Sequence, residues 1–160
     1  MTLRGAVQNQ HRSSVPQQLW SNNLSDVSTS RHLALKVMMM PRDTNPYGTI
    51  FGGVILSYID QAGAIGARFE IARHDFPTQD IVTVAMEGVE FHQPVFVGDC
   101  VSFWTELRSI GKTSITMHIT VETDRDGEVT KLTQADVTYV SVKTDGHTRR
   151  PVPIRGRKTD

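Results

Sequence analysis

The sequence predicts an α+β domain in which an antiparallel sheet of about five strands wraps around one long central helix. Three observations support this fold class: a single long apolar segment with many small residues, strand-like segments on both sides of it, and tight-turn residues between the last strands. Strands joined by tight turns are antiparallel neighbours, and an apolar helix must be covered by other elements. The helix and the sheet therefore form two layers around one core.

The first predicted strand covers residues 32–40 and precedes the helix. Its apolar residues alternate along the segment, at Leu33, Leu35, Val37 and Met39. This alternation places the four side chains on one face of the strand. Residues 41–48 contain two prolines together with Asp, Asn and Gly, which predicts a loop.

The helix is predicted over residues 52–73, and its apolar positions cover most of its circumference, which indicates burial. It carries a cluster of small residues, namely Ala62, Gly63, Ala64, Gly66 and Ala67. Glycine inside a helix costs about 1 kcal/mol relative to alanine. We therefore expect another backbone to approach the helix closely at these positions.

Only strand patterns follow the helix, over residues 81–91, 99–110, 113–123 and 131–142. The last of them loses its alternation at Ser141, which a bulge or cover on both faces near its end would explain. Gly111-Lys112 and Asp126-Gly127 lie where tight hairpin turns are expected, so the last three strands form an antiparallel meander. A sheet with one helix keeps an uncovered face and open edges, and we expect it to pair with a second copy.

Composition excludes several classes of protein. The 17 basic and 17 acidic residues give zero formal charge, which argues against a nucleic-acid partner. The single Cys100 excludes an internal disulfide and multi-cysteine metal sites, and it fits a reducing, cytoplasmic location. The histidines lack the spacing of metal ligands, so no metal is predicted. We expect no signal sequence, because residues 1–31 contain no apolar run. We expect no membrane span, because the most apolar segment contains Asp60, Gln61, Arg68 and Glu70.

We divide the chain into three parts: a polar tail at residues 1–31, a domain at residues 32–145 and a basic tail at residues 146–160. The first tail is rich in Gln, Asn and Ser, and we expect it to be flexible. We interpret the basic tail as a solvated segment that Pro151 and Pro153 keep extended.

The segment most informative about chemistry runs from residue 43 to residue 53 and is followed by Asp60. Two adjacent glycines at a helix start leave backbone N–H groups free, which suits an anion or a developing oxyanion. The spacing matches neither a Walker loop nor a dinucleotide-binding loop. Helix geometry alone leaves Asp60 with two interpretations: a surface carboxylate near Arg68, or a base or nucleophile in an apolar environment.

The block DTN-x-x-G-x-x-FGG-x6-D, from Asp43 to Asp60, has a specific spacing, and softer blocks such as Val97-Gly98-Asp99 follow it. This pattern resembles the hotdog-fold acyl-CoA thioesterases, in the branch that includes bacterial YciA-like enzymes and vertebrate cytosolic acyl-CoA hydrolases. The resemblance covers roughly residues 32–145 in the right order. It implies a hotdog fold and the hydrolysis of acyl-CoA to a free carboxylic acid and coenzyme A in fatty acid metabolism.

The resemblance also implies roles for individual residues. Asp60 is similar to the catalytic carboxylate, Asn45 to its polar partner, and Thr83 to a strand residue that approaches from the neighbouring subunit. The backbone N–H of Gly53 is similar to an oxyanion donor. Expected substrate contacts are Phe51, Gly52, Gly111, Lys112, Thr113 and Ser114. Coenzyme A is part of the substrate, so no separate cofactor is expected, and the expected assembly is a homodimer or a trimer of dimers.

One departure from the family is Gln93, where many relatives have a basic residue, which leaves Lys112 or the C-terminal cations to bind the coenzyme phosphates. His92 lies just past a strand, where it borders the pocket or stays a surface residue. A dehydratase of the same fold would need a histidine at the helix, and none is present there. A non-catalytic acyl-CoA sensor or scaffold remains the alternative from a different class, although Asp60, Asn45 and Thr83 argue against it.

Overall fold

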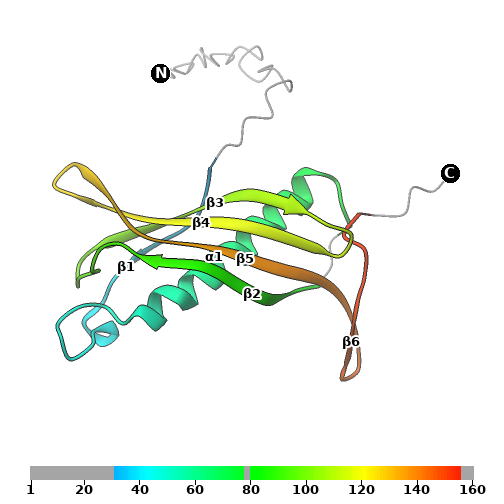
Figure 1. The fold of residues 1–160 in the computed structure, drawn as a ribbon, viewed down its shortest axis with the longest axis horizontal. Helices are drawn as coiled ribbons and strands as arrows, with labels where there is room; N and C mark the ends of the chain where they lie inside the picture. Colours follow the sequence, from blue (N-terminus) through cyan, green and yellow to red (C-terminus); the bar gives the residue numbers. More distant parts are fainter. Residues whose placement is uncertain (1–30, 78–79, 156–160) are drawn as a thin grey trace, which may run out of the picture.

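The computed structural model describes residues 31–77 and 80–155. Its elements in chain order are β1 (His32–Met38), the 3-10 helix η2 (Pro41–Asp43), α1 (Gly52–Arg73), β2 (Asp80–Phe91), β3 (Cys100–Ile110), β4 (Ser114–Arg125), β5 (Glu128–Asp145) and β6 (Thr148–Pro151). One antiparallel sheet and one long helix make up this part of the chain, which confirms the predicted α+β class (Figure 1). The predicted N-terminal tail lies outside the described residues, apart from Arg31.

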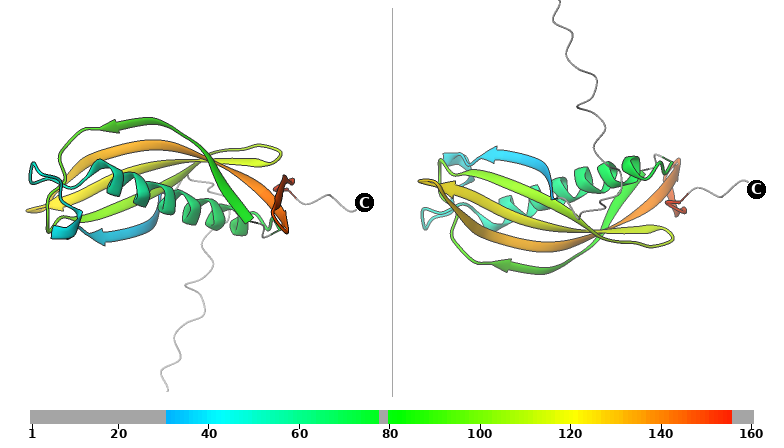
Figure 2. Two further views of the ribbon diagram at one scale, coloured as in Figure 1. Left: turned by 90° about the horizontal axis from the view of Figure 1, so that it is seen from below. Right: turned by 90° about the horizontal axis from the view of Figure 1, so that it is seen from above.

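The sheet has the strand order β1-β3-β4-β5-β2, and β6 pairs with the end of β5. α1 contacts each of the first five strands and lies along the inner face of the curved sheet (Figure 2). Alternate residues of β4 point toward α1 and are at most 1% exposed: Ile115, Met117, Ile119 and Val121. The core therefore lies between the helix and the sheet, as the alternation predicts.

The start of β1 departs from the predicted alternation. Its pairing with β3 shifts register between Leu33 and Leu35. An extra residue in a strand reverses the direction of the side chains that precede it. Leu33 is consequently 40% exposed, whereas Leu35 and Val37 pack against the core. The prediction that all four apolar side chains share one face is wrong for Leu33.

The sheet continues beyond residue 145, the predicted end of the domain. After β5 the chain turns back through Gly146, which has a φ of +56°. β4 begins partway along β5, and beyond that point β6 pairs with the same edge of β5. The Val152 N–H donates to the Ser141 carbonyl at 2.9 Å, and Ile154 is 1% exposed. Ser141 and its neighbour in β5 are both buried, which fits the expected cover on both faces. The Asp-Gly pair before β6 was the sequence signal for this hairpin.

Two helix glycines let side chains of the sheet approach α1. A Cβ on Gly63 would lie 2.2 Å from the Tyr139 hydroxyl oxygen, and a Cβ on Gly66 would lie 2.4 Å from Thr105 Oγ1. Side chains approach α1 closely at these two positions, so the prediction that another backbone approaches there is wrong. No helix in the described part of the chain is both long and apolar enough to cross a membrane.

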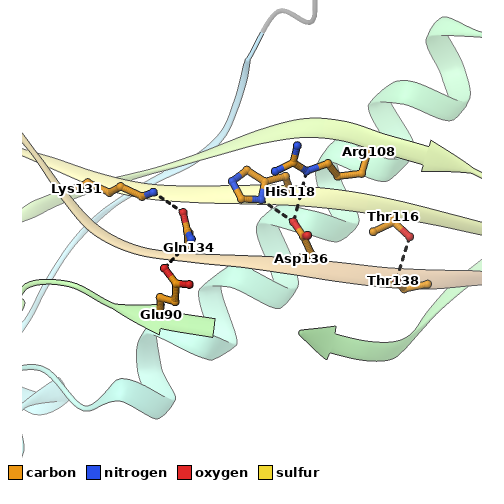
Figure 3. A network of polar contacts seen from close by, with 8 residues as sticks. All are labelled: Glu90, Arg108, Thr116, His118, Lys131, Gln134, Asp136 and Thr138. Carbon is orange, nitrogen blue, oxygen red and sulfur yellow. Dashed lines mark hydrogen bonds and ion pairs between the residues drawn. The ribbon is translucent and has the colours of Figure 1, made fainter. Parts of the chain in front are cut away.

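The sheet face away from α1 carries a network of polar side chains (Figure 3). His118 Nδ1 lies 2.5 Å from Asp136 Oδ1, and the Arg108 Nε lies 3.6 Å from the same oxygen. Thr116 and Thr138 are hydrogen bonded at 2.9 Å on the same two strands. This face is therefore polar, in contrast to the apolar inner face that covers the helix.

Candidate active site

Asp60 is half-buried in α1, and a residue of the neighbouring strand β2 holds its carboxylate. Thr83 donates a hydrogen bond from Oγ1 to Asp60 Oδ1 at 2.6 Å. Asp60 forms no ion pair with Arg68 in the described residues, so the interpretation as a surface carboxylate paired with that cation loses support. A neutral hydroxyl fixes the carboxylate in place and leaves its second oxygen free for other chemistry.

Thr83 and Asp60 meet within one chain. The resemblance implies that Thr83 approaches from the neighbouring subunit; the structure shows its contact with Asp60 of the same chain, and an approach between subunits stays a prediction. Thr83 pairs with Tyr139 across β2 and β5, and the side chains of such a pair point to the same face of the sheet. Because this face covers α1, Thr83 reaches the helix of its own chain.

A second contact fixes the main chain at the same residue. The Tyr139 hydroxyl donates to the Asp60 carbonyl oxygen at 2.7 Å. Burial and, to a smaller extent, the negative charge of Asp60 raise the pKa of the Tyr139 hydroxyl. Tyr139 therefore stays protonated and remains a hydrogen-bond donor across the pH range in which proteins work.

The N-terminus of α1 presents free backbone donors. Phe51 precedes the helix and provides no side-chain cap, and the first helical N–H that finds an acceptor is that of Val54. The N–H groups of Gly52 and Gly53 have no acceptor in the described residues, and Gly53 is exposed. Free N–H groups at the positive end of a helix dipole stabilise negative charge, as the two glycines predict.

A cavity of about 280 Å³ lies beside this helix start. It is lined by Thr49, Ile50, Gly52, Ile55, Phe91, His92, Gln93, Pro94 and Val95. The lining side chains Ile50, Ile55 and Val95 are at most 5% exposed, so an apolar wall faces polar groups such as His92. A small site with an apolar wall and a few polar groups is typical of a binding site for a small organic molecule.

The sequence comparisons identify the family. The profile of the Thioesterase superfamily matches residues 47–130. The acyl-CoA thioester hydrolase YciA of Salmonella typhimurium is 39% identical over 136 residues, which cover 82% of this chain and 97% of that protein. The chain belongs to the thioesterase superfamily.

Solved structures of the superfamily agree with the fold. A hexameric hotdog-fold thioesterase of Campylobacter jejuni is 42% identical, with a TM-score of 0.64 over 75% of this chain and 89% of that one. HI0827, a hexameric broad-specificity acyl-coenzyme A thioesterase, is 35% identical, with a TM-score of 0.69 over 81% of this chain and 90% of that one. The expected hotdog fold is therefore confirmed.

The structure does not bring Asn45 to Asp60 within the thioesterase domain of one chain. The Asn45 side chain donates to Thr49 Oγ1 at 2.8 Å and accepts from the Tyr47 N–H at 2.9 Å. These bonds shape the loop before α1, and no hydrogen bond joins Asn45 to Asp60 in the described residues. Asn45 is thus a loop-forming residue in the single chain, and its expected role beside Asp60 stays a prediction.

The predicted substrate contacts fall into two groups at opposite ends of the thioesterase domain. Phe51 and Gly52 lie where α1 begins, whereas the β3–β4 turn of residues 111–114 lies toward the end where α1 finishes (Figure 1). In that turn Gly111 N–H donates to the Ser114 carbonyl at 2.8 Å, and the Lys112 carbonyl accepts from Ile154 N–H at 3.0 Å.

Sequence reasoning missed most of the cavity wall and Tyr139. It placed His92 beside a pocket as one of two interpretations, and the structure confirms that placement. The other wall residues lie around the start of α1 and between Phe91 and Val95, and none of them apart from His92 carries a titratable side chain. Tyr139 lies in the middle of β5, and no feature of its local sequence indicated a contact with α1.

A partly buried ion pair holds one wall of the cavity. Arg125 at the end of β4 forms two bonds with Asp99, at 2.6 Å and 3.2 Å, and donates to the Pro94 carbonyl at 2.8 Å. Burial alone would raise the pKa of Asp99, but hydrogen bonds from Arg125 and from the Phe96 N–H, together with the charge of Arg125, lower it. The pair therefore ties the loop that carries Pro94 and Val95 to the sheet.

Replacing Arg125 with glutamine is expected to lower the free energy of unfolding by about 1–3 kcal/mol, as for other hydrogen bonds to charged groups. Because the pKa of Asp99 is lowered in the folded state, its ionised carboxylate stabilises that state at pH values above the pKa of the same group in the unfolded chain. This stabilisation is lost as the pH falls through the pKa of the folded state. The difference in the free energy of unfolding between wild type and variant should have its full size above about pH 5 and become smaller below about pH 4. Denaturant unfolding from pH 3 to pH 7 measures it.

The matched control is Arg42→Gln, because Arg42 is 79% exposed and lies 3.9 Å from its partner carboxylate. An exposed pair of this kind contributes little, so the control should unfold like the wild type. A free energy of unfolding of Arg125→Gln equal to that of the wild type at every pH would contradict the stabilising role of the ion pair. A difference that does not change with pH would contradict the part assigned to the Asp99 carboxylate.

Proposed function

We propose that this chain hydrolyses acyl-CoA thioesters to a free carboxylic acid and coenzyme A, with Asp60 as general base or nucleophile. The observation that carries the proposal is the hydrogen bond from Thr83 to the Asp60 carboxylate on a helix whose N-terminus has free N–H groups. Named relatives in the same superfamily are acyl-CoA thioester hydrolases. A carboxylate with one oxygen held and one free can accept a proton from water or attack a carbonyl carbon.

The chemistry of a thioester requires few catalytic groups. Coenzyme A leaves as a thiolate, and a thiol with a pKa near 8.5 departs without a strong general acid. The N–H of Gly53 would stabilise negative charge on the carbonyl oxygen in the transition state. In the general-base route Asp60 removes a proton from the attacking water. In the nucleophilic route its free oxygen forms an anhydride that water then cleaves.

The β3–β4 turn would bind the coenzyme part of the substrate, through Lys112, Thr113 and Ser114. Lys112 is exposed and has no ion-pair partner in the described residues. Lys143 and Arg150 pair across β5 and β6, close to the chain segment that contacts this turn, and they too lack an ion-pair partner there. Lys143 and Arg150 line a second cavity together with Asp145 and Val152, and the two cations there would bind the phosphates of coenzyme A. Coenzyme A enters as part of the acyl-CoA substrate and leaves as product, and no separate cofactor is proposed.

The working unit in this proposal is a homodimer or a trimer of dimers. β2 is an edge strand in the described sheet, so one side of its backbone is open to a strand from a second copy. Two superfamily members of known structure are hexamers. A cytoplasmic location is part of the proposal and rests on the single, unpaired Cys100.

Thiol release from acyl-CoA substrates of increasing chain length, followed with Ellman's reagent, tests the proposal. We expect turnover with at least part of the series and no turnover with the matching oxygen esters of simple alcohols. Binding of acyl-CoA without thiol release at any chain length would support a non-catalytic sensor instead. No binding and no release would remove acyl-CoA as the ligand class.

A further inference from the structure

We propose that Tyr139 is a positioning residue for Asp60 and that it works together with Thr83 as a two-point clamp. This inference rests on the proposed function, because it assigns Tyr139 a part in placing the carboxylate that acts on the thioester. Thr83 holds the carboxylate at 2.6 Å, and Tyr139 holds the main-chain carbonyl of the same residue at 2.7 Å. One contact alone would fix only the side chain or only the backbone.

The register of the sheet explains why the two contacts converge on one helix residue. Thr83 and Tyr139 are direct cross-strand partners, so their side chains leave the same face of the sheet next to each other. The pairing of β2 with β5 then shifts register between Thr83 and Ala85. The strand changes its alternation immediately after Thr83, so the clamp is confined to one cross-strand pair.

The clamp requires that the helix has no side chain at position 63. Tyr139 is 1% exposed, and its hydroxyl oxygen occupies the space where a side chain at position 63 would begin. A Cβ on Gly63 would lie 2.2 Å from that oxygen and 3.1 Å from the ring carbon that carries it. Real atoms do not approach so closely, so Gly63 is what allows the hydroxyl to reach the Asp60 carbonyl.

The hydrogen bond from Tyr139 is an addition to the ordinary helix pattern. In an α-helix, a carbonyl accepts the N–H four residues later, which for Asp60 is the N–H of Ala64. Removing the Tyr139 hydroxyl would therefore leave no carbonyl without a partner, and the buried ring would remain. The expected consequence is a shift in the position of Asp60 and not the loss of the fold.

Tyr139→Phe tests the proposal in steady-state kinetics with an acyl-CoA that the wild type hydrolyses. We expect kcat to fall about ten-fold, since small misplacements of a catalytic group have effects of this size or larger. KM should stay within about two-fold, because buried Tyr139 does not line the cavity. Tyr58→Phe is the matched control: Tyr58 packs against Phe103 and has no hydrogen bond to Asp60 in the described residues.

A double variant separates positioning from general stability. In an Asp60→Asn background, Tyr139→Phe should cause no further loss of residual activity, because the group it positions is already absent. A further ten-fold loss in that background would overturn the proposal, as would an unchanged kcat for Tyr139→Phe. If the wild type releases no thiol, the proposed function fails and the clamp fails with it, whereas an active wild type with an unaffected variant removes the clamp alone.

Gly63→Ala provides a second route if Tyr139→Phe does not fold. It displaces the hydroxyl from the Asp60 carbonyl and keeps the tyrosine itself. The folded fraction of Gly63→Ala should show the same pattern, a lower kcat with KM little changed. A folded Gly63→Ala protein with the kcat of the wild type would contradict the proposal.

Discussion

Asp60→Asn is expected to reduce thioester turnover by about 10³-fold, the scale on which general-base groups contribute to catalysis. Asparagine has the same shape, and its amide oxygen can still accept the hydrogen bond that Thr83 donates. It can neither take a proton from water nor form an anhydride, so both routes stop. The measurement is kcat from thiol release, with circular dichroism to verify the fold.

Asp75→Asn is the matched control for this prediction. Asp75 is exposed, lies just beyond the end of α1 and has a φ of +53°, a backbone conformation that asparagine adopts readily. The control should keep wild-type turnover. Wild-type turnover in Asp60→Asn would remove the catalytic assignment of Asp60 and leave the family assignment intact.

Gly66→Ala is expected to destabilise the fold although alanine is the better helix former. The new Cβ would lie 2.4 Å from Thr105 Oγ1 and 2.7 Å from Thr105 Cβ, and Thr105 is 1% exposed with no room to move away. Overpacking costs about 1–3 kcal/mol, against a gain of about 1 kcal/mol in helix propensity. We expect a loss of thermal stability of about 5 °C, measured by the midpoint of unfolding.

Gly53→Ala and Thr105→Ala complete this test. A Cβ on Gly53 meets nothing within 4 Å, so the same substitution there should keep or raise the unfolding midpoint. Thr105→Ala removes Oγ1, the nearest atom in the clash, and should restore part of the stability of Gly66→Ala. A Gly66→Ala midpoint above that of the wild type would show that the helix and β3 separate at low cost.

Features of the fold that depend on contacts within one segment could be predicted from the sequence, whereas features that depend on contacts between distant segments could not. The bounds of α1 and the buried face of β4 depend on periodicity within one segment, and the sequence predicted both. The bulge that turns Leu33 outward depends on how β1 pairs with β3, some seventy residues later in the chain. β6 carried a turn signal of its own, but its charged composition favoured the interpretation as a solvated tail.

The residues of the candidate site also differ in how well the sequence predicted them. Asp60 and the glycines before it lie within one block of sequence, and their spacing was sufficient to select them. The hydrogen bond between Tyr139 and Asp60 joins residues 79 positions apart, and no local sequence pattern predicts it. Thr83 was also selected, and the structure places it beside Asp60. Whether it reaches its own helix or that of a partner depends on strand order, which the sequence alone leaves open.

The hairpin of β5 and β6 has a further consequence for the behaviour of the chain in concentrated solution. β5 extends past the point where β4 begins, and an uncovered strand edge there would be a template for strands of other copies. β6 covers that edge with exposed residues that include Arg149 and Arg150, and it ends at Pro151, which lacks a backbone N–H. The end of the domain thus resists aggregation by strand addition, while the outer side of β2 keeps its backbone groups available for specific pairing.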